Sequence, residues 1–155
     1  RLSPAVVGDL APPTDAPLEP AVFDDVVFGD AVRLAGHTLG AFQPGQPLDV
    51  ILVWQALRPI DRNLTVFVHL VGTAGEPLGQ DDREPAHASY RTSDWQSGDV
   101  VIDRFRPMPA LDADGDAVVV VGWYSPETGE RLLTGDGADS VTLGPIGGIY
   151  ASGQG

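Results

Sequence analysis

The side chains best suited to ligand chemistry gather between Gln80 and Asp99, the longest stretch without a strand pattern. Sugar binding uses flat aromatic faces for stacking and planar polar groups for the hydroxyls. Long irregular loops in compact domains are often functional. The alternative is that Trp95 plugs the end of a core, as buried tryptophans commonly do. The residues that we single out for ligand binding are Tyr90, Trp95, Asp81, Asp82 and Arg91.

A second group of carboxylates alternates along the chain at Asp112, Asp114 and Asp116, as in a calcium-binding loop. An EF-hand loop needs Gly at its sixth position and Glu at its twelfth, but here the Gly is fourth. Asp and Gly are also the usual residues of hairpin turns. We therefore expect a turn and no cofactor, with calcium as the only weak candidate; Asp81–Asp82 and Asp136 with Asp139 are lesser alternatives for the same ion.

Residues for catalysis are harder to find. Asp103 lies between Val101 and Phe105 on one face of a predicted strand, where a glycosidase could carry an acid or base. No second carboxylate follows at a recognisable spacing, so an Asp–Arg structural pair is the favoured interpretation. The serines lack a GxSxG context, and the three histidines lack zinc-ligand spacing. A lone mid-strand histidine such as His69 is usually a half-buried structural residue. We predict no catalytic residue and no enzyme activity for this chain.

The charge balance excludes several partners. The formal net charge is −13, from 22 acidic residues against 9 basic ones, and all nine are Arg. Such a field repels the phosphates of nucleic acids and anionic membrane surfaces. No stretch approaches the roughly 20 apolar residues of a membrane span, so no direct membrane insertion is expected. The absence of Cys removes disulfides and thiol chemistry.

The elements that must position these residues are short and separated by turns, since Gly 19 and Pro 14 punctuate the 155 residues. We predict a Pro-rich linker or lead-in over 1–21, one domain over 22–146 and a flexible tail over 147–155. The domain is predicted to be all-β, an antiparallel two-sheet β-sandwich of jelly-roll or immunoglobulin-like type with eight or nine short strands. The expected strands are 26–28, 32–39, 48–57, 64–73, 78–82, 100–108, 117–125, 131–134 and 140–143.

Two of these strands, 48–57 and 117–124, are apolar on both faces. A strand with one solvated face should alternate apolar and polar residues. We therefore expect both strands to be covered twice, with Trp54 and Trp123 buried. One cover is the partner sheet; the other is the Pro-rich lead-in, a long loop or another chain.

Several motifs along the chain match a known pattern. They are FGD at 28–30, RLAGHTL at 33–39, PGQPLDVILVWQAL at 44–57, TVFVHL at 65–70 and VGWYSPETGERL at 121–132. Over 23–143 the chain resembles the soluble C-terminal domain of multi-spanning membrane glycosyltransferase-like proteins of Chloroflexi-type bacteria. In such proteins the transferase chemistry belongs to the membrane-embedded part, which is not in this sequence.

The resemblance implies an extracytoplasmic, membrane-tethered accessory domain of a glycan-handling protein, without a reaction of its own. Its partners would be a glycan or the membrane-embedded domain of the same parent chain. The chain begins without Met, so we expect it to be a piece of a longer protein. The alternatives are a free-standing carbohydrate-binding module and a hydrolase whose site the sequence does not reveal.

Overall fold

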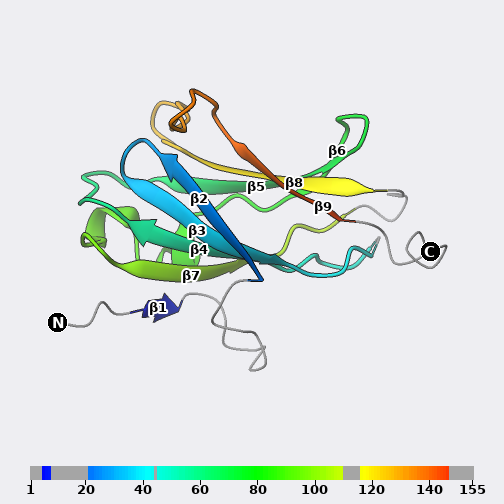
Figure 1. The fold of residues 1–155 in the computed structure, drawn as a ribbon, viewed down its shortest axis with the longest axis horizontal. Helices are drawn as coiled ribbons and strands as arrows, with labels where there is room; N and C mark the ends of the chain where they lie inside the picture. The colour runs from blue at the N-terminus through cyan, green and yellow to red at the C-terminus, as the bar shows by residue number, and fades with distance from the viewer. Residues whose placement is uncertain (1–4, 8–20, 44, 110–115, 147–155) are drawn as a thin grey trace.

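The described part of the chain is a two-layer β-sandwich (Figure 1). The computed structural model describes residues 5–7, 21–43, 45–109 and 116–146. One sheet has the strand order β1-β7-β4-β3-β2 and the other β6-β5-β8-β9, and every pair is antiparallel except β1–β7. The predicted fold class is confirmed. The strands are β1 (Ala5–Val7), β2 (Val22–Phe28), β3 (Val32–Leu39), β4 (Val50–Ala56), β5 (Thr65–Gly72), β6 (Pro77–Gln80), β7 (Val100–Phe105), β8 (Ala117–Tyr124) and β9 (Val141–Ile146).

The connections decide between the two predicted sandwich types. Strands β2, β3 and β4 stay neighbours in one sheet, as do β5–β6 and β8–β9 in the other. The chain changes sheet from β4 to β5, from β6 to β7 and from β7 to β8, so the inner pairs are β4–β7 and β5–β8. Immunoglobulin-type sandwiches pair their B and E strands in one sheet and their C and F strands in the other. Here β4 and β7 occupy the places of B and E, and β5 and β8 those of C and F. The fold is therefore immunoglobulin-like.

Local chemistry sets the tight turn between β2 and β3. Gly29 and Asp30 both have positive φ, 59° and 57°, and Ala31 N–H donates to the Phe28 carbonyl at 3.0 Å. Two successive left-handed residues define a type I′ turn, whose twist matches that of the flanking strands. Gly and Asp are among the residues that tolerate this conformation, so the two strands form a hairpin.

The core lies where β4 faces β8. Trp54 and Trp123 are both fully buried, as predicted, and their ring centroids lie 4.8 Å apart at an interplanar angle of 65°. Edge-to-face contacts of this kind add to the burial of the rings themselves. Each tryptophan continues an apolar stripe along its strand, so the contact joins the two sheets at their centre.

The second faces of these strands are also covered. On β4, Ile51 and Val53 are each 7% exposed and pack with Ile102 of β7. On the outer face of the other sheet, the Phe67 ring lies across β8 at Gly122, where a Cβ would stand 2.4 Å from its Cζ. The predicted double cover is confirmed for β4, whereas on β8 the outward residues other than Gly122 remain half-buried.

The lead-in contributes to the sandwich at one point. Ala5–Val7 form β1, which adds to the free side of β7 in parallel register. The rest of the predicted lead-in before Ala21, and the predicted tail over 147–155, lie outside the described residues.

One predicted strand is absent from the structure. The range 131–134 forms only single bridges, Arg131 with Tyr124 and Thr134 with Phe28. Tyr124 belongs to one sheet and Phe28 to the other. The segment therefore crosses from one sheet to the other and does not continue as a strand of either.

Replacing Trp123 with Ala should lower the free energy of unfolding by about 3–5 kcal/mol, because it removes a fully buried aromatic side chain from the centre of the core. Urea unfolding followed by circular dichroism measures the loss. Leu133→Ala is the control, since Leu133 is 55% exposed and should cost about 0.5 kcal/mol or less. Equal effects of the two substitutions would show that the assignment of inward faces is wrong.

Candidate functional site

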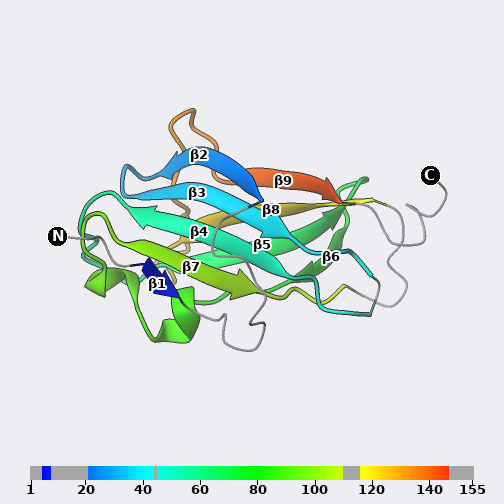
Figure 2. The ribbon, with the colours of Figure 1, turned by 60° about the horizontal axis from the view of Figure 1, so that its bottom comes forward.

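The segment from Asp81 to Asp99, the 81–99 segment, closes one side of the sandwich. It runs from β6, an edge strand of one sheet, to β7 in the other sheet. At its start Arg83 and Val66 exchange two backbone hydrogen bonds of 3.0 Å, so the segment extends beside β5. It then continues through two 3₁₀ turns, η1 (Pro85–Ala88) and η2 (Thr92–Asp94), which Figure 2 shows beside the start of β7. The segment is part of the sandwich wall.

Trp95 points into the core from this segment. Trp95 is only 2% exposed, and its ring packs edge-on against that of Trp123 with the ring centroids 5.7 Å apart. The indole N–H of Trp95 donates to the Tyr90 carbonyl at 3.0 Å, and the Tyr90 and Trp95 rings stack with centroids 6.4 Å apart. A sugar platform needs an exposed aromatic face, and Trp95 has none. The alternative that Trp95 plugs the end of the core therefore describes its position.

The polar groups of the same segment also bond inward. The Tyr90 hydroxyl donates to the carboxylate of Asp99, which also accepts the Gln96 N–H at 2.9 Å and is 2% exposed. The buried Thr92 hydroxyl accepts the Leu64 N–H at 2.9 Å. Buried polar groups are costly unless they are hydrogen-bonded, and these bonds meet that requirement within the segment and with the neighbouring Leu64. The loop is ordered by its own side chains.

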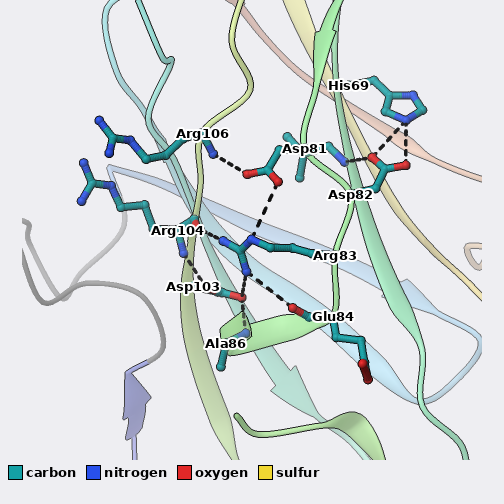
Figure 3. Close-up of polar contacts among 10 residues, drawn as sticks. His69, Asp81, Asp82, Arg83, Glu84, Ala86, Asp103, Arg104 and Arg106 are labelled. Atoms are coloured by element: carbon teal, nitrogen blue, oxygen red, sulfur yellow. Dashed lines mark hydrogen bonds and ion pairs between the residues drawn. The ribbon is translucent and has the colours of Figure 1, made fainter. Parts of the chain in front are cut away.

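The strongest polar contact of the segment is between Arg83 and Asp103 (Figure 3). Asp103 is fully buried on β7, and Arg83 Nη1 lies 3.3 Å from its Oδ2. The same oxygen accepts the Ala86 N–H at 2.6 Å, while Oδ1 accepts the Arg104 N–H at 2.8 Å. The guanidinium also donates to the Arg104 carbonyl and lies 4.1 Å from the centre of the Phe105 ring. Asp103 therefore forms an Asp–Arg pair, and its partner comes from the segment that follows β6 of the other sheet.

The backbone around Ala86 is bent to make this contact. Ala86 has a φ of 54°, a left-handed conformation that costs an L-residue about 1–2 kcal/mol. The bend places its N–H against the buried carboxylate. Strain of this kind persists only where the surroundings hold it, and here the Asp103 carboxylate does so.

The two neighbouring carboxylates of the predicted ligand set serve different partners. Asp81 accepts the Arg106 N–H at 2.8 Å and lies 3.8 Å from Arg83 Nε. Asp82 lies 3.3 Å from His69 Nε2, which makes His69 a half-buried, partnered histidine as predicted. Figure 3 shows the two carboxylates directed to opposite sides of the segment.

The remaining member of the set, Arg91, is exposed and forms an ion pair of 3.3 Å with Glu84. With Trp95 in the core and the two aspartates directed apart, the five predicted ligand residues do not converge on one open surface.

The structure describes only part of the candidate calcium ligand set. Asp112 and Asp114 lie outside the described residues, and Asp116 is exposed at the start of β8. Among the described residues no group of three or more His, Asp or Glu side chains could hold a metal ion. The Thr134 hydroxyl, and then the Ala138 N–H, lower the pKa of the Asp136 carboxyl, whereas Asp139 pairs with Arg131 at 3.4 Å.

A polar pair that the sequence did not point to lies between the sheets at the other side. His37 of β3 is 6% exposed, and its Nδ1 stands 2.6 Å from Oδ2 of Asp24 on β2. Both side chains line a groove of about 550 Å³ between β2, β3 and β9. Alternation along β3 would have placed His37 opposite the core side, but the register shifts between Leu34 and Gly36. Asp24 alternates with Val26 and Phe28 on the inner side of β2, which puts its carboxylate next to His37.

Comparisons with protein-family models, with curated proteins and with solved structures found no match for this chain. The family resemblance therefore stays a prediction. In the part of the chain that the structure describes, no helix is long and apolar enough to cross a membrane.

Replacing Asp103 with Asn should destabilise the fold by about 3 kcal/mol, because the largely buried Arg83 guanidinium loses its buried carboxylate partner and keeps only Asp81, at 3.8 Å from Nε. Chemical denaturation measures the change. Asp61→Asn is the matched control, since Asp61 is exposed, and it should stay within about 0.5 kcal/mol of the parent protein.

The double variant Arg83→Met, Asp103→Leu separates the charge from the packing. It should be less destabilised than the sum of the two single variants, since apolar residues of similar volume replace a buried ion pair well. An Asp103→Asn variant as stable as Asp61→Asn would contradict this account of the pair.

Proposed function

We propose that this chain is a non-catalytic, extracytoplasmic accessory domain of a membrane-bound glycan-handling protein, and that its task is to brace an adjoining domain. The observation that carries the proposal is Phe23, which exposes 77% of its surface on edge strand β2. Bracing is preferred over sugar binding because Trp95 is buried in the core and the other predicted ligand residues of the 81–99 segment do not converge on one surface. The link to glycan handling rests on the sequence resemblance.

The position of Phe23 supports an interface. In the register of the five-stranded sheet, Phe23 is paired with Gly36, Gly36 with Val53, and Val53 with Ile102. Val53 and Ile102 belong to the apolar cluster on the outer face, so this row crosses that face and ends at Phe23. Exposed aromatic residues that continue an apolar row are typical of protein contacts.

The flanking rows mix polar side chains with residues of the apolar cluster. Arg33 pairs in register with Gln55 on one side of the apolar row, and Thr38 pairs with Ile51 on the other. Arg104 opposite Ile51 is held by Asp49 at 2.9 Å. Val53 and Ile102 are themselves buried, so Phe23 is the exposed end of this row and the part available to a second domain. The same sheet also accepts β1 beside β7, at the edge opposite β2.

Photocrosslinking in the full-length gene product tests the proposal. With Phe23 replaced by p-benzoylphenylalanine, irradiation should join β2 to a peptide of the adjoining domain, identified by mass spectrometry. The same substitution at Leu133 is the control, because Leu133 is exposed on a different segment and should give no such product.

Crosslinks from position 23 only to the sandwich itself would contradict bracing through this surface. A full-length product with no further domain would favour the free-standing carbohydrate-binding module instead.

A further inference from the structure

The two sides of the sandwich are finished differently. On one side the 81–99 segment closes the space between the sheets through Arg83, Asp103 and Trp95. On the other side the edges are β2 and β9, which Figure 2 shows running next to each other. The groove of about 550 Å³ opens between them and is here named the edge groove. Its volume falls within the range of small-molecule sites, about 300–1,000 Å³.

The walls of the edge groove are mainly apolar. Val22 and Leu39 line it from the five-stranded sheet, and Val141, Leu143 and Ile146 line it from β9. The polar groups Asp24 and His37 lie on the same wall as Leu39. Apolar walls with a few placed polar groups are the usual composition of a ligand site.

The His37–Asp24 pair is costly where it stands. His37 pairs in register with Leu52, a fully buried core residue, so its side chain faces the inside of the sandwich. Asp24 is only 15% exposed at its side chain. Apolar residues of similar volume often stabilise a fold as well as a buried polar pair does. The pair is therefore better explained by a ligand than by stability.

The hydrogen-bond roles within the pair follow from the carboxylate. A carboxylate only accepts, so Nδ1 of His37 carries the proton and donates to Asp24 at 2.6 Å. Nε2 has no hydrogen-bond partner among the described residues, and the ring lines the edge groove. Nε2 accepts a hydrogen bond when the imidazole is neutral and donates one when it is protonated. A hydroxyl group satisfies both states.

We propose that the edge groove binds a small amphipathic alcohol, with its hydroxyl on His37 Nε2 and its aliphatic body between Leu39 and β9. The Asp24 carboxylate and the net charge of −13 disfavour anionic amphiphiles such as fatty acids. Strand addition by a peptide is disfavoured as well, because Pro145 lacks an N–H on β9 and a bulge interrupts β2. The proposal is independent of the bracing role.

Titration of the isotope-labelled chain with 1-hexanol, followed by NMR, tests the site. Saturable shifts are expected at Leu39, Val141 and Ile146 and at the Nε2 nitrogen of His37. 1-Methoxypentane has the same number of heavy atoms but no O–H. At a pH where the nitrogen-15 shift of His37 Nε2 shows a neutral imidazole, it should bind about five- to tenfold more weakly through the loss of one hydrogen bond.

Two variants make the result specific. His37→Asn keeps an N–H for Asp24 but removes the nitrogen that faces the groove, so hexanol and the ether should bind it equally. His69→Asn disrupts the other His–Asp pair, which lies outside the edge groove, and should keep the preference for hexanol. The dispersion of the amide spectrum reports whether each variant is folded.

The proposal is overturned if hexanol gives no saturable shifts at the groove residues, or if hexanol and the ether bind the parent chain equally. A folded His37→Asn variant that still prefers hexanol would overturn it as well.

Discussion

The buried carboxylate of Asp103 is the constraint on which the rest of the structure depends. A fully buried charge is tolerated only if it is paired and hydrogen-bonded, and the chain meets this need by sending Arg83 across from the other sheet. Arg83 pairs with Val66 of β5 through its backbone and contacts β7 through its guanidinium. One residue thus fixes the distance between the sheets and anchors the long segment that follows it.

Once that segment is fixed, the functional interpretation changes. Side chains that would suit a sugar site if they were exposed instead complete the wall and the core, with Trp95 against Trp123 as the deepest contact. Accessible chemistry is then left at the opposite side of the sandwich. There, Phe23 stands on the surface of an edge strand, and His37 lines the groove between the sheets.

Much of the fold is predictable from local pattern. The double apolar faces of the strands around Trp54 and Trp123 follow from residue type and alternation alone, and so does the tight turn at Gly29. What alternation cannot supply is the effect of a bulge: the register shift in β3 turns His37 to the inner side, where it meets Asp24. Nor does spacing reveal that Arg83, twenty positions before Asp103, is its partner, because the topology brings them together.

Native-state hydrogen exchange tests most directly whether the 81–99 segment folds as part of the sandwich wall. Each of three backbone amides in this segment donates a hydrogen bond: Arg83 to the Val66 carbonyl, Ala86 to the Asp103 carboxylate and Trp95 to the Thr92 carbonyl. The account predicts that they exchange only through global unfolding, with a free energy within about 1 kcal/mol of that of Leu52 and Val121 in the core. Exchange of these three amides through a local opening several kcal/mol easier than global unfolding would contradict it.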